Sequence, residues 1–152
     1  MENKRKIFIR AFNLLDMERI LEIEKLSFAF DAFSEKTFKS FYKKCPGLFI
    51  LAGIEGMIAG YMLTCIYKTK SNVISIAVAP NYRSKGMGRI LVEYTLEKLK
   101  YISIKSTELE VRVTNFAGIK FWKSLGFTSF GYNHGYYSDG QDAIKMRKIL
   151  SE

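Results

Sequence analysis

The amino-acid sequence predicts one domain of mixed α/β class, in which a central mixed sheet of about seven strands is flanked by about four helices. The first observation behind this prediction is size, because 152 residues with 48% hydrophobic content suit a single domain with a sizeable core. The second is a set of short apolar segments joined by turn residues, which is typical of antiparallel strands. The third is the later alternation of strand-like and helical segments, which predicts strands connected through helices.

A strand and two helices open the chain. The strand is predicted over residues 7–12, and the helices over residues 14–26 and 35–44. Asn13 and Ser34 stand directly before the two helices, where a side-chain oxygen can cap unpaired backbone amides.

Three strands follow these helices. Residues 48–53 and 57–67 are predicted to form a hairpin, because Glu55-Gly56 between them is typical of a tight turn. The third strand is predicted over residues 73–79.

The remaining elements alternate between helices and strands. A helix, a strand, a second helix and two final strands are predicted over residues 87–100, 108–113, 116–125, 127–133 and 143–149. Asn115 occupies the N-cap position of the second of these helices, and Gly126 stands where that helix should stop.

The junction over residues 73–88, VISIAVAPNYRSKGMG, predicts a site for an anion. The strand cannot continue its hydrogen-bond ladder through Pro80, because proline has no N–H group to donate. Gly86 and Gly88 then open a helix, whose first N–H groups have no partner within the helix. Unpaired amides at the positive end of a helix dipole attract phosphate.

Arg83, Lys85 and Arg89 add positive charge to the same turn. The spacing does not match a P-loop, and the dinucleotide fingerprint would need a glycine in place of Leu91. On its own, the pattern is equally typical of an ordinary basic helix start that opens with glycine.

The downstream segment over residues 109–146 reads LEVRVTNFAGIKFWKSLGFTSFGYNHGYYSDGQDAIKM. Its marked residues are Asn115, the pair Phe121-Trp122 and the dipeptide Gly126-Phe127. Together with Arg83-x-x-Gly86-x-Gly88, they resemble the two CoA-binding blocks of the GNAT superfamily of acetyl-CoA-dependent N-acetyltransferases. The resemblance extends over nearly the whole chain, residues 1–152, as a single GNAT domain.

The motifs LEVR, SLGF and YYSDGQDA are similar to those of protein N-terminal acetyltransferases, both the ribosomal-protein-alanine type and the archaeal general type. FSEKTF, which begins at Phe33, also resembles the alanine type. The resemblance implies transfer of an acetyl group from acetyl-CoA to the α-amine of protein N-termini, by direct attack in a ternary complex. Ribosomal proteins are one class of substrate that it suggests.

The resemblance implies that acetyl-CoA lies where the sheet splays open, between the strands predicted over residues 73–79 and 108–113. The cofactor-binding residues that it implies are Ile76, Ala77, Val78, Arg83, Ser84, Lys85, Gly86, Met87, Gly88, Asn115 and Trp122.

Glu110, the second residue of LEVR, is the candidate catalytic residue. An α-amine with a pKa of about 7.8 is deprotonated at neutral pH roughly 400-fold more often than a lysine side chain with a pKa of about 10.4. A site for N-termini therefore needs only a modest base, and the resemblance places a catalytic glutamate here. The alternative is an ordinary exposed carboxylate on a strand.

Two residues depart from the family pattern. Trp122 stands where relatives often have a tyrosine that protonates the departing sulfur, and an indole N–H is not a useful acid. Trp122 is therefore expected either to pack along CoA or to belong to the core. Asn72, just before the strand predicted over residues 73–79, stands where many N-terminal enzymes have a histidine, and asparagine cannot titrate.

Substrate recognition is expected to depend on two loops, residues 27–34 and the segment between the last two strands. The substrate-binding residues implied by the resemblance are Phe28, Phe30, Asp31, Tyr136 and Tyr137. Phe28, Phe30 and Phe33 are candidates to line a small apolar pocket, or else they are core residues, and Asp31 is either an attractor for the ammonium group or a turn residue.

No metal site and no disulfide are predicted. Cys45 and Cys65 lack the spacing of metal ligands, and His134 stands alone. The first ten residues are basic rather than apolar, and the longest apolar run, residues 48–54, is far shorter than the roughly 18 residues that span a bilayer. We therefore expect a cytoplasmic protein without a membrane partner.

The net charge of +9 raises the question of nucleic-acid binding. Residues 1–70 carry 12 basic and 8 acidic side chains and residues 71–152 carry 12 and 7, so the excess is spread along the chain. This favours a solvated surface, part of which faces the phosphates of CoA, over direct nucleic-acid binding.

Three other functions stay open at this level. They are a GNAT enzyme for a small amine or polyamine, a weakly catalytic acyl-CoA-binding regulatory domain, and a basic RNA-binding domain, although no RNA-binding motif is present. The sequence does not decide between a monomer, a homodimer and an enzyme with an auxiliary subunit.

Overall fold

The computed structural model describes residues 6–45 and 48–151. Its described residues form two compact units. The first contains those up to Cys65 together with Ile74–Thr95, and the second contains Ile66–Val73 together with those from Leu96 onward. β3 (Met57–Tyr67), β4 (Lys70–Val78) and α3 (Met87–Tyr101) each contribute residues to both units.

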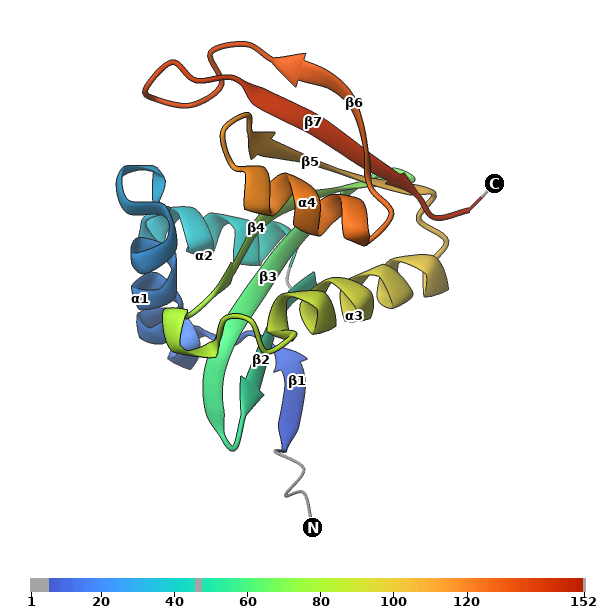
Figure 1. Cartoon of the computed structure of the whole chain (residues 1–152). Coiled ribbons are helices and arrows are strands. Elements are labelled where there is room, and N and C mark those ends of the chain that lie inside the picture. The colour runs from blue at the N-terminus through green and yellow to red at the C-terminus, as the bar shows by residue number, and fades with distance from the viewer. Residues whose placement is uncertain (1–5, 46–47, 152) are drawn as a thin grey trace. The chain divides into compact units, whose positions relative to one another are not determined.

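Within the described ranges, seven strands form one mixed sheet with the order β1-β2-β3-β4-β5-β7-β6 (Figure 1). β1 pairs with β2, and β2 with β3, in antiparallel fashion, whereas β4 and β5 run parallel. β7 pairs antiparallel with both β5 and β6. The predicted mixed sheet with four flanking helices, α1 to α4, is therefore confirmed.

The first unit is built around the aromatic and aliphatic side chains that its helices and strands share. Its further elements are β1 (Ile7–Ala11), η1 (Leu14–Asp16), α1 (Met17–Phe28), η2 (Ala29–Asp31), α2 (Glu35–Lys44), β2 (Phe49–Ile54) and η4 (Pro80–Tyr82). Ile20 and Ile23 of α1 and Phe38 of α2 are fully buried with Phe49 and Tyr61 of the sheet. Burying several such side chains contributes roughly 2 kcal/mol each before the entropy of ordering is counted.

Local sequence signals set the ends of these elements as predicted. Asn13 accepts a hydrogen bond from the N–H of Leu15, and Ser34 from the N–H of Thr37. Glu55 and Gly56 have φ values of 51° and 82°, which is the left-handed pair that a two-residue hairpin turn between β2 and β3 requires.

The second unit contains the last four elements of the chain: β5 (Ser106–Arg112), α4 (Phe116–Ser124), β6 (Thr128–Asn133) and β7 (Ala143–Ile149). The side chain of Asn115 caps α4 by accepting from the N–H of Gly118 at 2.9 Å. Gly126 follows the helix with φ 90°, a conformation that glycine adopts without strain, so the predicted helix stop is also confirmed.

The main difference from the sequence-based expectation is where two central strands begin. β4 begins at Lys70 rather than at residue 73, and β5 at Ser106 rather than at residue 108. The residues by which these strands are longer than predicted pair with each other in parallel, from Lys70 with Ser106 to Asn72 with Glu108. Their side chains are polar or charged, so no apolar pattern marks them as strands. Asn72 therefore lies within β4 and not before it.

The register between β4 and β5 ends at the pair Asn72–Glu108 among the described residues. A smaller difference concerns α1, whose first predicted turn is a separate 3-10 turn, η1.

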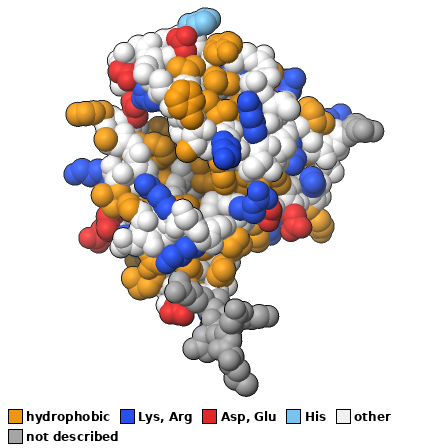
Figure 2. Space-filling model, viewed as in Figure 1, with side chains coloured by type: hydrophobic (Ala, Val, Ile, Leu, Met, Phe, Trp, Pro, Cys, Tyr) orange, Lys and Arg blue, Asp and Glu red, His pale blue; other side chains and the backbone are white. Residues whose placement is uncertain are grey.

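Charge is distributed as the sequence suggested. Figure 2 shows lysine and arginine side chains scattered among hydrophobic and acidic ones on the face that it displays. Within the described residues, no helix has the length and apolarity to cross a membrane.

Candidate active site

The turn that leads into α3 presents backbone amides in a geometry suited to an anion. Ser84 and Gly86 have φ values of 61° and 80°, and the carbonyl of Gly86 accepts from the N–H of Ile90 at 3.0 Å, which closes the first turn of the helix. The next amides, those of Met87 and Gly88, are among those that a helix leaves without a partner of its own. A Cβ added to Gly86 would have no heavy atom within 4 Å, so the space beside this backbone is open. The turn fits a phosphate group.

Arg83 makes two hydrogen bonds within the first unit. Its Nε donates to the carbonyl of Val78 at 3.0 Å, and its Nη2 donates to Ser27 Oγ at 3.3 Å. The side chain thus connects the turn to the end of β4 and to α1 in the structure. Lys85 lies over the ring of Tyr82 with its Nζ 5.6 Å from the centroid, and its side chain is exposed.

Other residues predicted to bind the cofactor differ in their exposure to solvent. The side chain of Met87 is only 1% exposed and belongs to the core, so its backbone N–H is the part available to a ligand. Ile76 and Val78 are half-buried on one face of β4, whereas Ala77 faces the other way and is buried.

Glu110 lies on β5 in the second unit, on the face opposite Val111, as strand alternation predicted. It is half-buried and pairs across the sheet with Lys145 of β7. Burial raises the pKa of Glu110, the positive charge of Lys145 lowers it, and the negative charge of Glu108 raises it. The net result is a raised pKa, which makes Glu110 a better proton acceptor than a fully solvated carboxylate when it is ionised.

Tyr136 comes from the loop between β6 and β7. Burial raises the pKa of its hydroxyl, and the negative charge of Glu110 raises it further. This electrostatic coupling brings together a predicted catalytic residue and a predicted substrate-binding residue within the second unit.

Arg112 organises the same loop, although the sequence analysis did not single it out. Its Nη1 donates to Asp139 Oδ2 at 2.7 Å and to Gln141 Oε1 at 2.9 Å. Its guanidinium carbon also lies 4.0 Å from the ring centroid of Tyr137. The sequence did contain a signal for Arg112, which is the last residue of the LEVR motif. By strand alternation it lies on the same face of β5 as Glu110.

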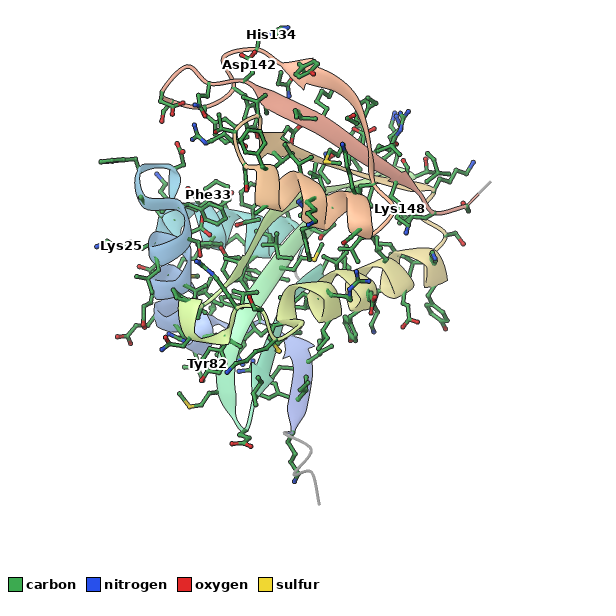
Figure 3. The ribbon with its side chains drawn as sticks, in the orientation of Figure 1. Lys25, Phe33, Tyr82, His134, Asp142 and Lys148 are labelled. Atoms are coloured by element: carbon green, nitrogen blue, oxygen red, sulfur yellow. The ribbon has the colours of Figure 1, made fainter. Side chains whose placement is uncertain are left out.

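Asp142 fixes the start of this loop. Its carboxylate accepts from the N–H of Gly135 at 2.8 Å and lies 3.0 Å from Nδ1 of His134. These two contacts, first the backbone N–H and then the imidazole, lower the pKa of Asp142. Figure 3 shows His134 and Asp142 together at this loop.

Two further predicted cofactor residues have structural roles. Asn115 uses its side-chain oxygen to cap α4. Trp122 is 6% exposed and packs edge-to-face on Phe121 and Phe127, with ring centroids 5.1 Å and 5.0 Å away. This agrees with the core alternative for Trp122.

The segment over residues 27–34 divides into exposed and packed parts. Phe28 is 38% exposed and Phe30 fully exposed, so neither is a core residue. Phe33 packs against Phe38 and Phe41 at centroid distances of 5.7 Å and 5.9 Å, as expected of a core residue. Asp31 is the last residue of the short turn η2.

Glu24 is a buried polar residue of the first unit that the sequence analysis missed. It lies on the core-facing side of α1 and hydrogen-bonds the backbone N–H of Phe33 and the hydroxyls of Tyr61 and Ser75. Burial raises its pKa, and the N–H of Phe33 and the hydroxyl of Ser75 oppose this. A helical pattern alone gives no sign that partners from distant strands will satisfy such a carboxylate.

The sequence was compared with protein-family models and with known proteins. Residues 16–127 match the model of the acetyltransferase (GNAT) family. The chain is 30% identical to an N-alpha-acetyltransferase of Sulfurisphaera tokodaii, over 93% of this chain and 92% of that protein. It is 33% identical to the [ribosomal protein bS18]-alanine N-acetyltransferase of Escherichia coli, over 94% and 97%.

A solved structure of Ard1 from Thermoplasma volcanium superposes with a TM-score of 0.92 at 26% identity, covering 96% of this chain and 99% of that one. The chain therefore belongs to the GNAT family of acetyltransferases.

Proposed function

We propose that this chain transfers an acetyl group from acetyl-CoA to the N-terminal α-amine of protein substrates. The observation that carries this proposal is the arrangement of the second unit, where the half-buried Glu110 shares a strand face with Arg112, and Arg112 holds the loop that carries both tyrosines. Two relatives support it. They are named as N-alpha- and alanine N-acetyltransferases, and each matches this chain over more than nine-tenths of both proteins.

The proposed roles follow from the chemistry of each group. When bound, acetyl-CoA supplies a thioester carbonyl that an amine can attack. Glu110 accepts a proton from the α-ammonium group, directly or through water, so that the nitrogen lone pair is available. The new C–N bond forms as the C–S bond breaks, and the second proton that the nitrogen loses passes to the sulfur, directly or through water. A thiol with a pKa of about 8.5 leaves in this way without needing a strong acid.

The remaining site residues are assigned to binding. Tyr136 and Tyr137 are proposed to hold the backbone of the first substrate residues, and the exposed Phe28 and Phe30 to contact the first side chain. Asp31 is proposed to attract the ammonium group. The amides that open α3, with Arg83, Ser84 and Lys85, are proposed to bind the phosphates of CoA. We place the reaction in the cytoplasm, where protein N-termini are made.

Initial rates with one panel of acceptors test this function. The panel contains peptides with different free N-termini, one lysine peptide with a blocked N-terminus, and spermidine. We expect turnover on at least one free N-terminus, and rates at least tenfold lower on the other two acceptors. Preferred turnover of spermidine would instead identify an enzyme for small amines, and the absence of turnover on every acceptor would favour a regulatory acyl-CoA-binding domain.

A further inference from the structure

Glu24 places a carboxylate where α1 otherwise presents apolar side chains to the core. Met17, Ile20 and Ile23 are the buried apolar residues of this helix, and Glu24 is only 2% exposed beside them. An ionised carboxylate is costly to bury unless its oxygens are satisfied, and a well-packed apolar side chain often serves stability as well or better. Packing alone therefore does not explain a glutamate here.

The two oxygens of Glu24 contact different parts of the first unit. Oε2 accepts from the hydroxyl of Tyr61 on β3 and from Ser75 Oγ on β4 at 3.2 Å, and these two hydroxyls lie 3.0 Å apart. Oε1 accepts from the backbone N–H of Phe33 at 3.0 Å, nine residues further along the chain. One carboxylate thus joins the sheet to the segment over residues 27–34.

This hydrogen bond fixes the segment close to its exposed part. Ala29 has φ 47°, so the chain turns sharply after α1, and Phe28 and Phe30, on either side of Ala29, are exposed. The ring of Phe33 packs on α2, and Glu24 holds its amide. The buried contacts of Phe33 therefore fix the position of the exposed residues Phe28 and Phe30.

We propose that Glu24 is a positioning residue, which holds the 27–34 segment in the conformation that receives the first residues of the acceptor. This role rests on the proposed function, in which that segment contacts the substrate. Glu24 itself does not reach solvent and is not expected to touch the peptide.

Three variants separate positioning from stability. Glu24→Leu replaces the carboxylate with an apolar side chain and removes the acceptor for the N–H of Phe33. Tyr61→Phe is the matched control, because it removes one donor to Oε2 and leaves the contact of Oε1 with Phe33 unchanged. Glu24→Gln is the conservative rescue, because its carbonyl oxygen can still accept from Phe33.

We expect Glu24→Leu to raise the KM for the peptide at least tenfold while kcat and the KM for acetyl-CoA stay within about threefold. Tyr61→Phe and Glu24→Gln should keep the peptide KM within about threefold of the parent, whatever their thermal stability. An unchanged peptide KM in Glu24→Leu, or an equal rise in Tyr61→Phe, overturns the positioning role.

A second measurement does not depend on the folding of any variant. Amide hydrogen exchange in the parent should be at least tenfold slower at Phe33 than at Phe30 of the same segment. Equal exchange at the two amides overturns the inferred hold on the segment. Peptide turnover by the parent is measured first, because its absence contradicts the proposed function, whereas normal turnover with an unchanged KM in Glu24→Leu contradicts only the role of Glu24.

Discussion

At the scale of single residues, Glu110 combines two properties that a base for an α-amine needs. It is buried enough for its pKa to be raised, yet Lys145 opposite it on β7 limits that rise and favours the ionised form. An α-amine loses its proton near pH 8 without help, so a carboxylate of this kind is sufficient. The same residue in a lysine-specific site would face a much larger barrier to deprotonation.

Glu110→Gln should therefore lower kcat about 100-fold at pH 7, as removal of a general base does. The deficit should shrink above pH 8, where the substrate supplies its own free base. In the parent, activity should fall as the pH drops through a carboxyl pKa above the ordinary value, because protonated Glu110 cannot accept the proton, and this acidic limb should vanish in the variant. Stopped-time assays from pH 5 to pH 9 measure both effects.

Glu108→Gln is the matched control for this substitution, because Glu108 lies on the same strand face two residues earlier. We expect its kcat at pH 7 to stay within about threefold of the parent. An unchanged kcat in Glu110→Gln would leave Glu110 as an ordinary strand carboxylate.

Trp122 leads to a different expectation, since its ring is buried between Phe121 and Phe127. Trp122→Phe should cost about 1 to 3 kcal/mol of unfolding free energy, because it opens space in the core, while kcat changes less than threefold. Phe127→Leu in the same cluster should behave alike. A stable Trp122→Phe enzyme whose kcat falls 100-fold would instead assign proton transfer to this position.

At the scale of elements, the proposed phosphate site lies at the start of α3. Gly86→Val should weaken CoA binding at least tenfold, because the new side chain enters the open space beside the helix amides. Gly56→Val is a closely matched control. Gly56 has φ 82° against 80° at Gly86, a Cβ at either meets no atom within 4 Å, and Gly56 lies in the β2–β3 turn.

Calorimetric titration with CoA distinguishes the two variants. Both should lose similar stability from the left-handed backbone, of the order of 1 kcal/mol, but only Gly86→Val should lose affinity. Equal CoA affinity in the two variants would mean that the phosphates bind elsewhere.

The entry into α1 depends on a second electrostatic element. Asp16 accepts from both terminal nitrogens of Arg10 at 2.8 Å and from the N–H of Asn13 at 2.9 Å. The hydrogen bond from Arg10, followed by that from Asn13, lowers the pKa of Asp16 against the opposing effect of burial. Since Arg10 is 42% exposed, its share is reduced by solvent screening.

Asp16→Ala should therefore cost about 1 to 2 kcal/mol at pH 7. A carboxyl with a lowered folded-state pKa stabilises the protein fully above its ordinary pKa of about 3.9, and this contribution disappears as the pH falls through the lowered value. Urea unfolding of parent and variant should show a difference at pH 7 that becomes smaller below pH 4. A difference that is constant with pH would exclude the ionised pair as its source.

The same elements show what a sequence can predict. Asn13, Ser34, Asn115 and the Glu55-Gly56 turn were predicted correctly because each acts on backbone within a few residues. The start of β4 was wrong because Lys70–Asn72 pairs with Ser106–Glu108 of β5, which lies far along the chain. Glu24 was missed for the same reason, since Tyr61 and Ser75 lie 37 and 51 residues away.

At the scale of the whole molecule, each unit supplies one part of the proposed chemistry. The first unit carries the amides that open α3 and the segment held by Glu24. The second carries Glu110 and the loop organised by Arg112. The excess positive charge is spread over the chain, so recognition of the acceptor is expected to rest on these local contacts and not on a charged patch.

The most direct test of the central claim uses two peptides of identical sequence that begin with alanine and contain one internal lysine, one with a free and one with a formylated N-terminus. Initial rates with acetyl-CoA at pH 7, with the acetylated position identified by fragmentation mass spectrometry, should be at least 100-fold higher for the free peptide and should place the acetyl group on its α-amine. The difference in deprotonated fraction between the two amines, roughly 400-fold, sets this expectation. Equal rates for the two peptides, with acetylation on the lysine, would contradict it.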